Sequence, residues 1–140
     1  WQVISSPPRC VAASCWVVTL QSGSTNNFFG LKVTSESISA DRVNQNLKQY
    51  LASGDEFSQT AYEGTPSKEV VTTKEITVGN LSAIQRAEEW LAAGFHTVVT
   101  YLKKDNTVYH LQLQTNSSGQ YSNEDLKIYN NILSTFKFTK

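Results

Sequence analysis

The most regular alternation of hydrophobic and polar positions lies between residues 67 and 115. Four segments there carry β-branched and aromatic residues at alternate positions, namely 70–78, 81–90, 95–102 and 107–114. They are separated by residues that favour turns: Gly79-Asn80, residues 91–94 and Lys104-Asp105-Asn106. Short alternating segments with such breaks are typical of antiparallel strands joined by tight turns. The pattern therefore predicts a four-stranded antiparallel meander.

Tight turns at Gly79-Asn80 and Asp105-Asn106 would fix the register of this meander. The facing pairs would be Val78 with Leu81, Ile76 with Ala83, Leu102 with Tyr109, Thr100 with Leu111, and Val98 with Leu113. These pairs make one face apolar, and a slip of one residue would exchange the two faces. The other face would carry four residues of mixed character, which we interpret as a half-exposed binding surface: Tyr101, His110, Gln112 and Gln114.

Outside the meander, the sequence predicts three more strands, at residues 1–4, 15–20 and 28–34. A first amphipathic helix is expected to begin near Ser39, as its N-cap, and to stop at Gly54. A second should begin at Ser122, with Asp125 completing a capping box. Its apolar stripe consists of Leu126, Tyr129, Ile132, Leu133 and Phe136.

These elements predict a single α+β domain over residues 1–140. We expect an antiparallel sheet of about six to seven strands, with two amphipathic helices covering its apolar face. Phe136 should pack against Val98, Leu111 and Leu113, and truncating it to alanine should cost on the order of 3–5 kcal/mol if it is fully buried.

Charge and composition narrow the classes of function. Lysine and arginine number 12, and so do aspartate and glutamate, so no net field favours nucleic acid or an anionic membrane. No apolar run approaches the roughly 20 residues that a membrane-spanning helix needs. The chain starts at Trp1 and contains no methionine, which favours a mature or trimmed domain. We expect an extracytoplasmic protein, either secreted or anchored at the cell surface, from which a leader that carried a lipid anchor has been removed.

The two cysteines, Cys10 and Cys15, are separated by four residues. A hairpin there would bring their Cα atoms within the roughly 4.4–6.8 Å that a disulfide requires. The spacing favours a disulfide, and two free thiols are the alternative. With two cysteines and no histidine or carboxylate nearby, a zinc site is not expected.

The sequence gives little indication of a catalytic site. In the predicted register His96 and His110 lie on opposite faces, and so do the neighbours Glu88 and Glu89. Glu75 and Arg86 are expected to form an exposed pair that contributes little. The sequence contains no Gly-x-Ser-x-Gly elbow, glycine-rich phosphate loop or paired metal-ligand motif. We therefore predict a protein that is not an enzyme and has no cofactor.

The C-terminal segment 129–138, Tyr-Asn-Asn-Ile-Leu-Ser-Thr-Phe-Lys-Phe, resembles the ending of bacterial secreted proteins and lipoproteins of the PsbP-like group. Trp1 is placed as the opening tryptophan of that group would be, and the 76–83 hairpin resembles its central hairpin. The resemblance implies a Mog1/PsbP-like α/β/α sandwich. It implies no single function, since photosynthetic members support the oxygen-evolving centre and Mog1 binds a GTPase. No functional residue of the group matches this sequence by motif.

Two hypotheses on function follow. The first is a non-enzymatic extracytoplasmic domain that binds another macromolecule, either a protein or a cell-surface partner. The second is a domain that binds a small ligand or a metal in a pocket between helix and sheet.

Overall fold

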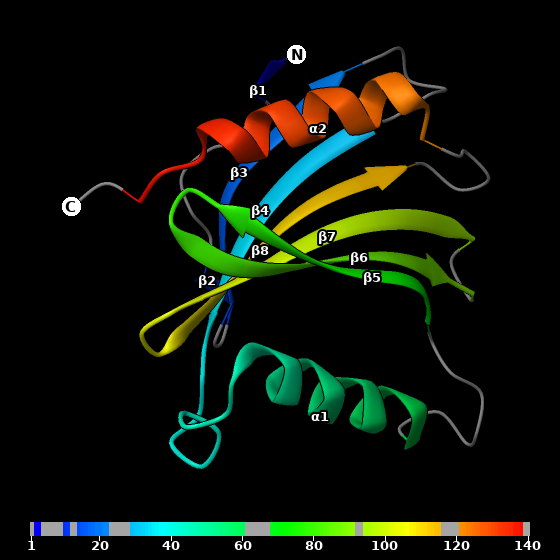
Figure 1. Ribbon diagram of the computed structural model, residues 1–140. Helices are drawn as coiled ribbons and strands as arrows, with labels where there is room; N and C mark the ends of the chain where they lie inside the picture. Colours follow the sequence, from blue (N-terminus) through cyan, green and yellow to red (C-terminus); the bar gives the residue numbers. More distant parts are fainter. Residues whose placement is uncertain are drawn as a thin grey trace.

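The computed structural model arranges the chain as one antiparallel sheet with a helix on each of its two faces (Figure 1). It describes residues 2–3, 10–11, 14–22, 29–60, 68–91, 94–115 and 121–138. The strands are β1 (Gln2–Val3), β2 (Cys10–Val11), β3 (Ser14–Ser22), β4 (Phe29–Ser37), β5 (Glu69–Val78), β6 (Leu81–Trp90), β7 (Phe95–Lys104) and β8 (Thr107–Thr115). The helices are α1 (Leu47–Thr60) and α2 (Asn123–Thr135).

The strand order in the sheet is β1-β3-β4-β8-β7-β6-β5, and β2 pairs with β3 off this path. The α+β class, the antiparallel sheet and the two helices are thus confirmed. Among the described residues the sheet has eight strands rather than six or seven; the strand that was not predicted is β2, a piece of two residues. Strand β5 forms one edge of the sheet.

The predicted register of the meander is confirmed at every facing pair. Strands β5 and β6 pair Val78 with Leu81 and Ile76 with Ala83, and β7 and β8 pair Thr100 with Leu111. Gly79 begins the first turn at a φ of 61°, which glycine adopts without strain and which the tight hairpin requires. The faces of the sheet are therefore assigned as expected.

Helix α2 covers the apolar face. Its Ser122 cap and Asp125 exchange the two hydrogen bonds of a capping box, as predicted. Tyr129 and Leu133 are buried against a sheet cluster of Leu31, Val78, Ala83, Val98, Leu102, Leu111 and Leu113. The Tyr129 hydroxyl lies 2.7 Å from both the Leu111 carbonyl oxygen and the Thr100 hydroxyl, so this buried polar group is satisfied. Phe136 packs against the same cluster, but only half-buried, because it is the C-cap.

Helix α1 lies on the opposite face, so the expectation that both helices cover the apolar face is wrong. Its predicted boundaries are also wrong. Residues 40–44 form turns, and the helix begins after Asn46, whose side chain accepts from the Gln49 N–H at 3.0 Å. Gly54 lies inside the helix instead of ending it. A glycine in a helix interior lowers stability by only about 1 kcal/mol relative to alanine, and the contacts of Leu51 and Asp55 hold the helix on either side of Gly54.

Among the described helices, none is long and apolar enough to cross a membrane.

Candidate functional site

Charged side chains gather between α1 and the sheet face that it covers. The Nη1 atom of Arg86 donates to both carboxylate oxygens of Asp55, at 3.0 and 2.8 Å. The Nζ atom of Lys68 lies 3.0 Å from Glu88 and 3.7 Å from Asp55. Glu88 is only 2% exposed, and Arg86 is 9% exposed. Two cations and two anions thus balance each other in a partly buried network, in which the buried Arg86 and Glu88 each have a partner of opposite charge.

Tyr101 extends this network into the sheet. Its hydroxyl donates to Glu88 at 2.8 Å, and its ring is 6% exposed. Burial raises the pKa of Tyr101 well above its ordinary value, and the negative charge of Glu88 adds to the effect. Tyr101 therefore remains protonated at any physiological pH and acts as a hydrogen-bond donor.

A third carboxylate, Glu36 on β4, lies further along the same face. His110 Nε2 lies 3.3 Å from Glu36 Oε1, and the Tyr50 hydroxyl of α1 donates to the same oxygen. His110, and more weakly Tyr50, lower the pKa of Glu36 despite the opposing effect of its burial. The His110 ring also meets Tyr101 edge-on, with centroids 4.9 Å apart. Glu36 and His110 therefore connect the N-terminal half of α1 to the centre of the sheet.

The structure brings together the four residues that the sequence assigned to a binding surface. Tyr101 faces His110 across β7 and β8, while Gln112 and Gln114 follow on the same face. The side chains of His110, Gln112 and Gln114 are half-buried, but Tyr101 is buried, so it cannot contact a partner while α1 is in place. A binding role for the other three stays a prediction.

The predicted exposed pair of Glu75 and Arg86 is wrong. Arg86 binds Asp55, whereas Glu75 forms an exposed ion pair with Lys48 of α1. The error follows from the misplaced end of α1, because Asp55 lies four residues after the buried Leu51 and so faces the sheet. A helix continued through Gly54 would have indicated this partner.

The other candidate groups lie apart. Glu88 is buried, and Glu89 and His96 are on the opposite face from Glu88 and His110, as the register predicted. Within the described ranges, no three histidine, cysteine, aspartate or glutamate side chains are placed to bind a metal. The backbone pairs Cys10 directly with Cys15 across β2 and β3. Their side chains lie outside the described part, so the disulfide stays a prediction.

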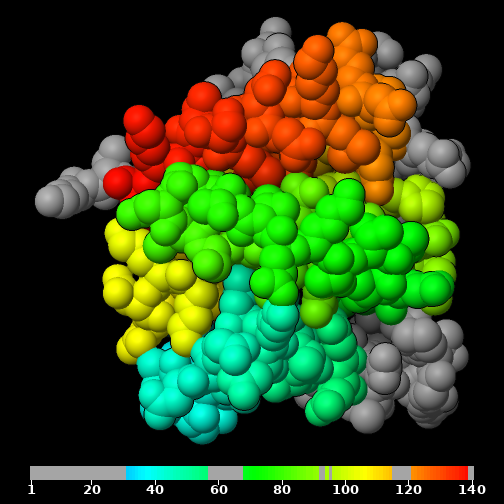
Figure 2. Space-filling view, viewed as in Figure 1, coloured from blue at the N-terminus to red at the C-terminus, as the bar shows by residue number. Residues whose placement is uncertain are grey.

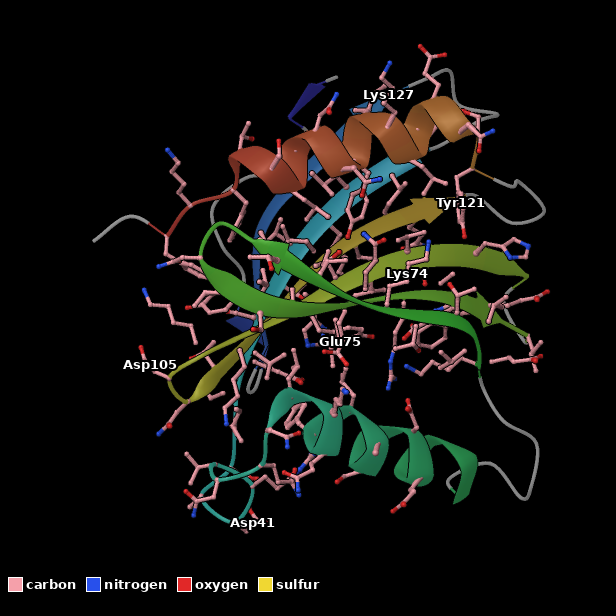
Figure 3. The ribbon with its side chains drawn as sticks, viewed as in Figure 1. Asp41, Lys74, Glu75, Asp105, Tyr121 and Lys127 are labelled. Carbon is pink, nitrogen blue, oxygen red and sulfur yellow. The ribbon has the colours of Figure 1, made fainter. Side chains whose placement is uncertain are left out.

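Strand β5 offers a different kind of site. It is the edge strand at one end of the sheet, and most of its side chains are exposed, with Val71 at 58%. Figure 2 shows β5 running across the front of the molecule between the two helices, with neither helix lying over it. Lys74 and Glu75 point from it in opposite directions, Glu75 toward α1 (Figure 3). An edge strand presents unpaired backbone groups along its length.

Two hollows adjoin this edge. The first, of about 400 Å³, lies between the start of α1 and strands β5 and β6, and is lined by Asn46, Leu47, Lys48, Glu75, Ile76, Thr77, Ser82, Ala83 and Ile84. The second, of about 470 Å³, lies where the β5–β6 turn meets Phe136 and Phe138. A ligand along β5 would therefore find space for side chains beside the strand.

Comparisons with known proteins support the fold and leave the function open. No known family profile matches the sequence, and no curated protein matches it. A crystal structure of PA94 from Pseudomonas aeruginosa, a protein of unknown function described as a candidate regulator, is similar with a TM-score of 0.56. The two chains are 9% identical, and the match covers 87% of this chain and 98% of the other. The likeness shows a shared fold. Membership of the PsbP-like group stays a prediction, which superposition on members of that group would test.

Proposed function

We propose that the protein is a non-enzymatic, extracytoplasmic binding domain that recognises another protein along the β5 edge of its sheet. The observation that carries this proposal is the exposure of β5, a ten-residue outer strand, beside a hollow of about 400 Å³. Monomeric proteins usually cover or shorten such an edge. The buried charges between α1 and the sheet are paired with each other, which favours a supporting role for them.

Site-specific photo-crosslinking tests the proposal. A photoreactive residue is placed at Val71 on β5 and, as a control, at Lys127 on the outward side of α2 (Figure 3). Both variants are expressed in the cells that naturally make the protein. We expect a discrete protein adduct from position 71 and none from position 127. Equal adducts from both positions, or none from 71, would refute binding at this edge. Fractionation of the same cells tests the proposed location outside the cytoplasm.

A second candidate function, binding of a small polar ligand between α1 and the sheet, is favoured by a separate observation. On this face the buried Nε atom of Arg86 and the buried Oγ1 atom of Thr97 have no hydrogen-bond partner within the described part of the chain. Buried polar groups normally have one. A thermal-shift screen of metals and metabolites would test this function, with Thr97→Val as the control. A hit that stabilises the wild type and not the variant would support it.

A further inference from the structure

We infer that the β5 edge binds an extended segment of the partner protein as an added β-strand, with an acidic residue opposite Lys74. This inference rests on the proposed function and specifies its mode and the chemistry of its partner. In this mode the main chain of the peptide supplies hydrogen bonds, and alternate side chains supply specificity.

The hairpin turn decides which backbone groups of β5 face outward. The two residues that flank a two-residue turn form a hydrogen-bonded pair, here Val78 with Leu81. Hydrogen-bonded and non-hydrogen-bonded pairs alternate along an antiparallel ladder. Residues 72, 74, 76 and 78 therefore bond to β6, whereas Thr73, Glu75 and Thr77 direct their N–H and C=O groups away from it.

These outward groups are free to receive a strand. Strand β5 pairs with β6 alone, and none of the outward groups of Thr73, Glu75 and Thr77 takes part in a backbone hydrogen bond to any described residue. The register shift in β5 lies between Val70 and Thr72, so the ladder from Thr72 to Val78 is regular. The outer edge thus offers three consecutive donor–acceptor sites at the spacing of an ordinary strand.

The charge on β5 favours a foreign strand over a second copy of the chain. Two copies of β5 could extend the sheet as an antiparallel pair only about a two-fold axis perpendicular to it. An axis through residue 74 or 75 sets two lysines or two glutamates opposite each other, which is unfavourable. An axis through another residue leaves Lys74 opposite an uncharged residue of the same face, such as Thr72 or Val78. Lys74 forms no ion pair with a described side chain, so an acidic residue opposite it would be its natural partner.

The two faces of the added strand would meet different surroundings. Lys74 points away from α1, whereas Glu75 points toward it (Figure 3). On the side of α1, the hollow beside Leu47 and Ile84 could take apolar side chains from alternate residues of the peptide. The expected partner segment therefore alternates acidic or polar residues on one face with apolar residues on the other.

Fluorescence polarisation with a synthetic peptide tests the inference. The probe, roughly eight residues long like an ordinary strand, alternates isoleucine and threonine, with glutamate at the central polar position. Its control carries lysine there. We expect the glutamate peptide to bind at least about fivefold more tightly than the lysine peptide, since opposite charges stabilise a cross-strand pair and like charges destabilise it. Lys74→Glu should reverse this preference.

Thr73→Pro is the decisive variant. Proline removes the outward N–H of residue 73 and is tolerated at an edge where that group is not part of the ladder. It should weaken peptide binding at least about tenfold, whereas Thr73→Ala, which keeps the N–H, should bind like the wild type. Circular dichroism and the melting temperature establish that both variants are folded. If Thr73→Pro does not fold, Thr77→Pro takes its place, because the N–H of Thr77 also points away from β6.

The outcomes separate the inference from the proposed function. Thr73→Pro that binds the peptide like the wild type would overturn strand addition, and so would a peptide that binds no form of the protein. In either case a persistent crosslink at position 71 would leave the proposed function standing. If sedimentation shows that the wild type is a dimer and that Thr73→Pro is a monomer, the β5 edge binds a second copy of the chain and not a strand of another protein. Peptide binding without any cellular crosslink would instead refute the proposed function.

Discussion

Arg86 Nη1 lies 3.0 and 2.8 Å from the two carboxylate oxygens of Asp55, so the centre of β6 is tied by charge to α1. Helix α2 is held differently, by an apolar stripe that buries Tyr129 and Leu133. In α1, Leu51 is the one buried apolar residue among the described side chains of the helix. Leu51, with the half-buried Leu47 and Tyr50, packs against a second apolar cluster that includes Ile84, Val99 and Val108. The α1 layer therefore combines apolar packing with ion pairs, whereas the α2 layer is mainly apolar, which predicts different responses to mutation and pH.

Asp55→Asn should destabilise the protein more than Glu75→Gln. The first change leaves the buried guanidinium of Arg86 without its anion, which should lower the free energy of unfolding by about 2 kcal/mol. Glu75 and Lys48 are about two-thirds exposed, so removing the charge of Glu75 should cost less than about 1 kcal/mol. Urea unfolding of both variants measures the difference. Equal losses would mean that the Arg86 pair contributes no more than a surface pair.

The stability contributed by Glu36 should disappear in acid. Its pKa in the folded state lies below the ordinary value of 4.5, chiefly because of His110, so folding favours the ionised carboxylate. The contribution is therefore complete above pH 4.5 and is lost as the pH falls through the lower, folded-state pKa. Urea unfolding of the wild type and Glu36→Gln from pH 7 to acid pH should show the gap between them closing below pH 4.5. A gap that stays constant with pH would contradict the assigned pKa shift.

Leu133→Ala should cost more than Phe136→Ala. Leu133 is 4% exposed in the α2 cluster, so its truncation should lower the free energy of unfolding by about 3 kcal/mol. Phe136 is half-buried at the C-cap, so about 1.5 kcal/mol is expected there, less than for a fully buried phenylalanine. Thermal and urea unfolding of the two variants compare them. A larger loss for Phe136→Ala would show that the helix end, rather than its centre, anchors α2.

The pairing of Cys10 with Cys15 predicts a disulfide that stabilises the protein modestly. Facing Cα atoms in an antiparallel pair are about 4.5 or 5.5 Å apart, and both distances suit a disulfide. The closed loop is short, so the bridge should contribute on the order of 2 kcal/mol. Reduction should lower the melting temperature by a few degrees without unfolding the protein at room temperature. Mass spectrometry that finds two free thiols under non-reducing conditions would contradict the bridge.

Local signals predicted the meander and α2 correctly. The turn at Gly79-Asn80 fixes the register by itself, because a two-residue loop leaves one choice of facing pairs. Ser122 and Asp125 fix the start of α2 in the same way, through hydrogen bonds within one turn. Both features depend on residues close together in the chain, which a sequence displays directly.

The parts that could not be predicted depend on distant residues. Gly54 favours the end of an isolated helix, but Asp55 is held by Arg86, 31 positions away in the chain. A glutamate such as Glu88 is expected to be exposed when only the sequence is known. Its burial is possible because Lys68 and Tyr101 both donate hydrogen bonds to its carboxylate. The exposure of β5 follows from the strand order, which the pattern of one strand does not contain. Both the charged network and the open edge therefore required the tertiary structure.

Amide hydrogen exchange along β5 tests the open edge most directly. In the free protein, the amides of Thr73, Glu75 and Thr77 should exchange quickly, while those of Thr72, Lys74 and Ile76, bonded to β6, should be protected. Addition of the glutamate peptide should protect the first three and leave the others unchanged. Uniform protection of all six amides in the free protein would show that the edge is already covered. No gain at residues 73, 75 and 77 with bound peptide would contradict strand addition.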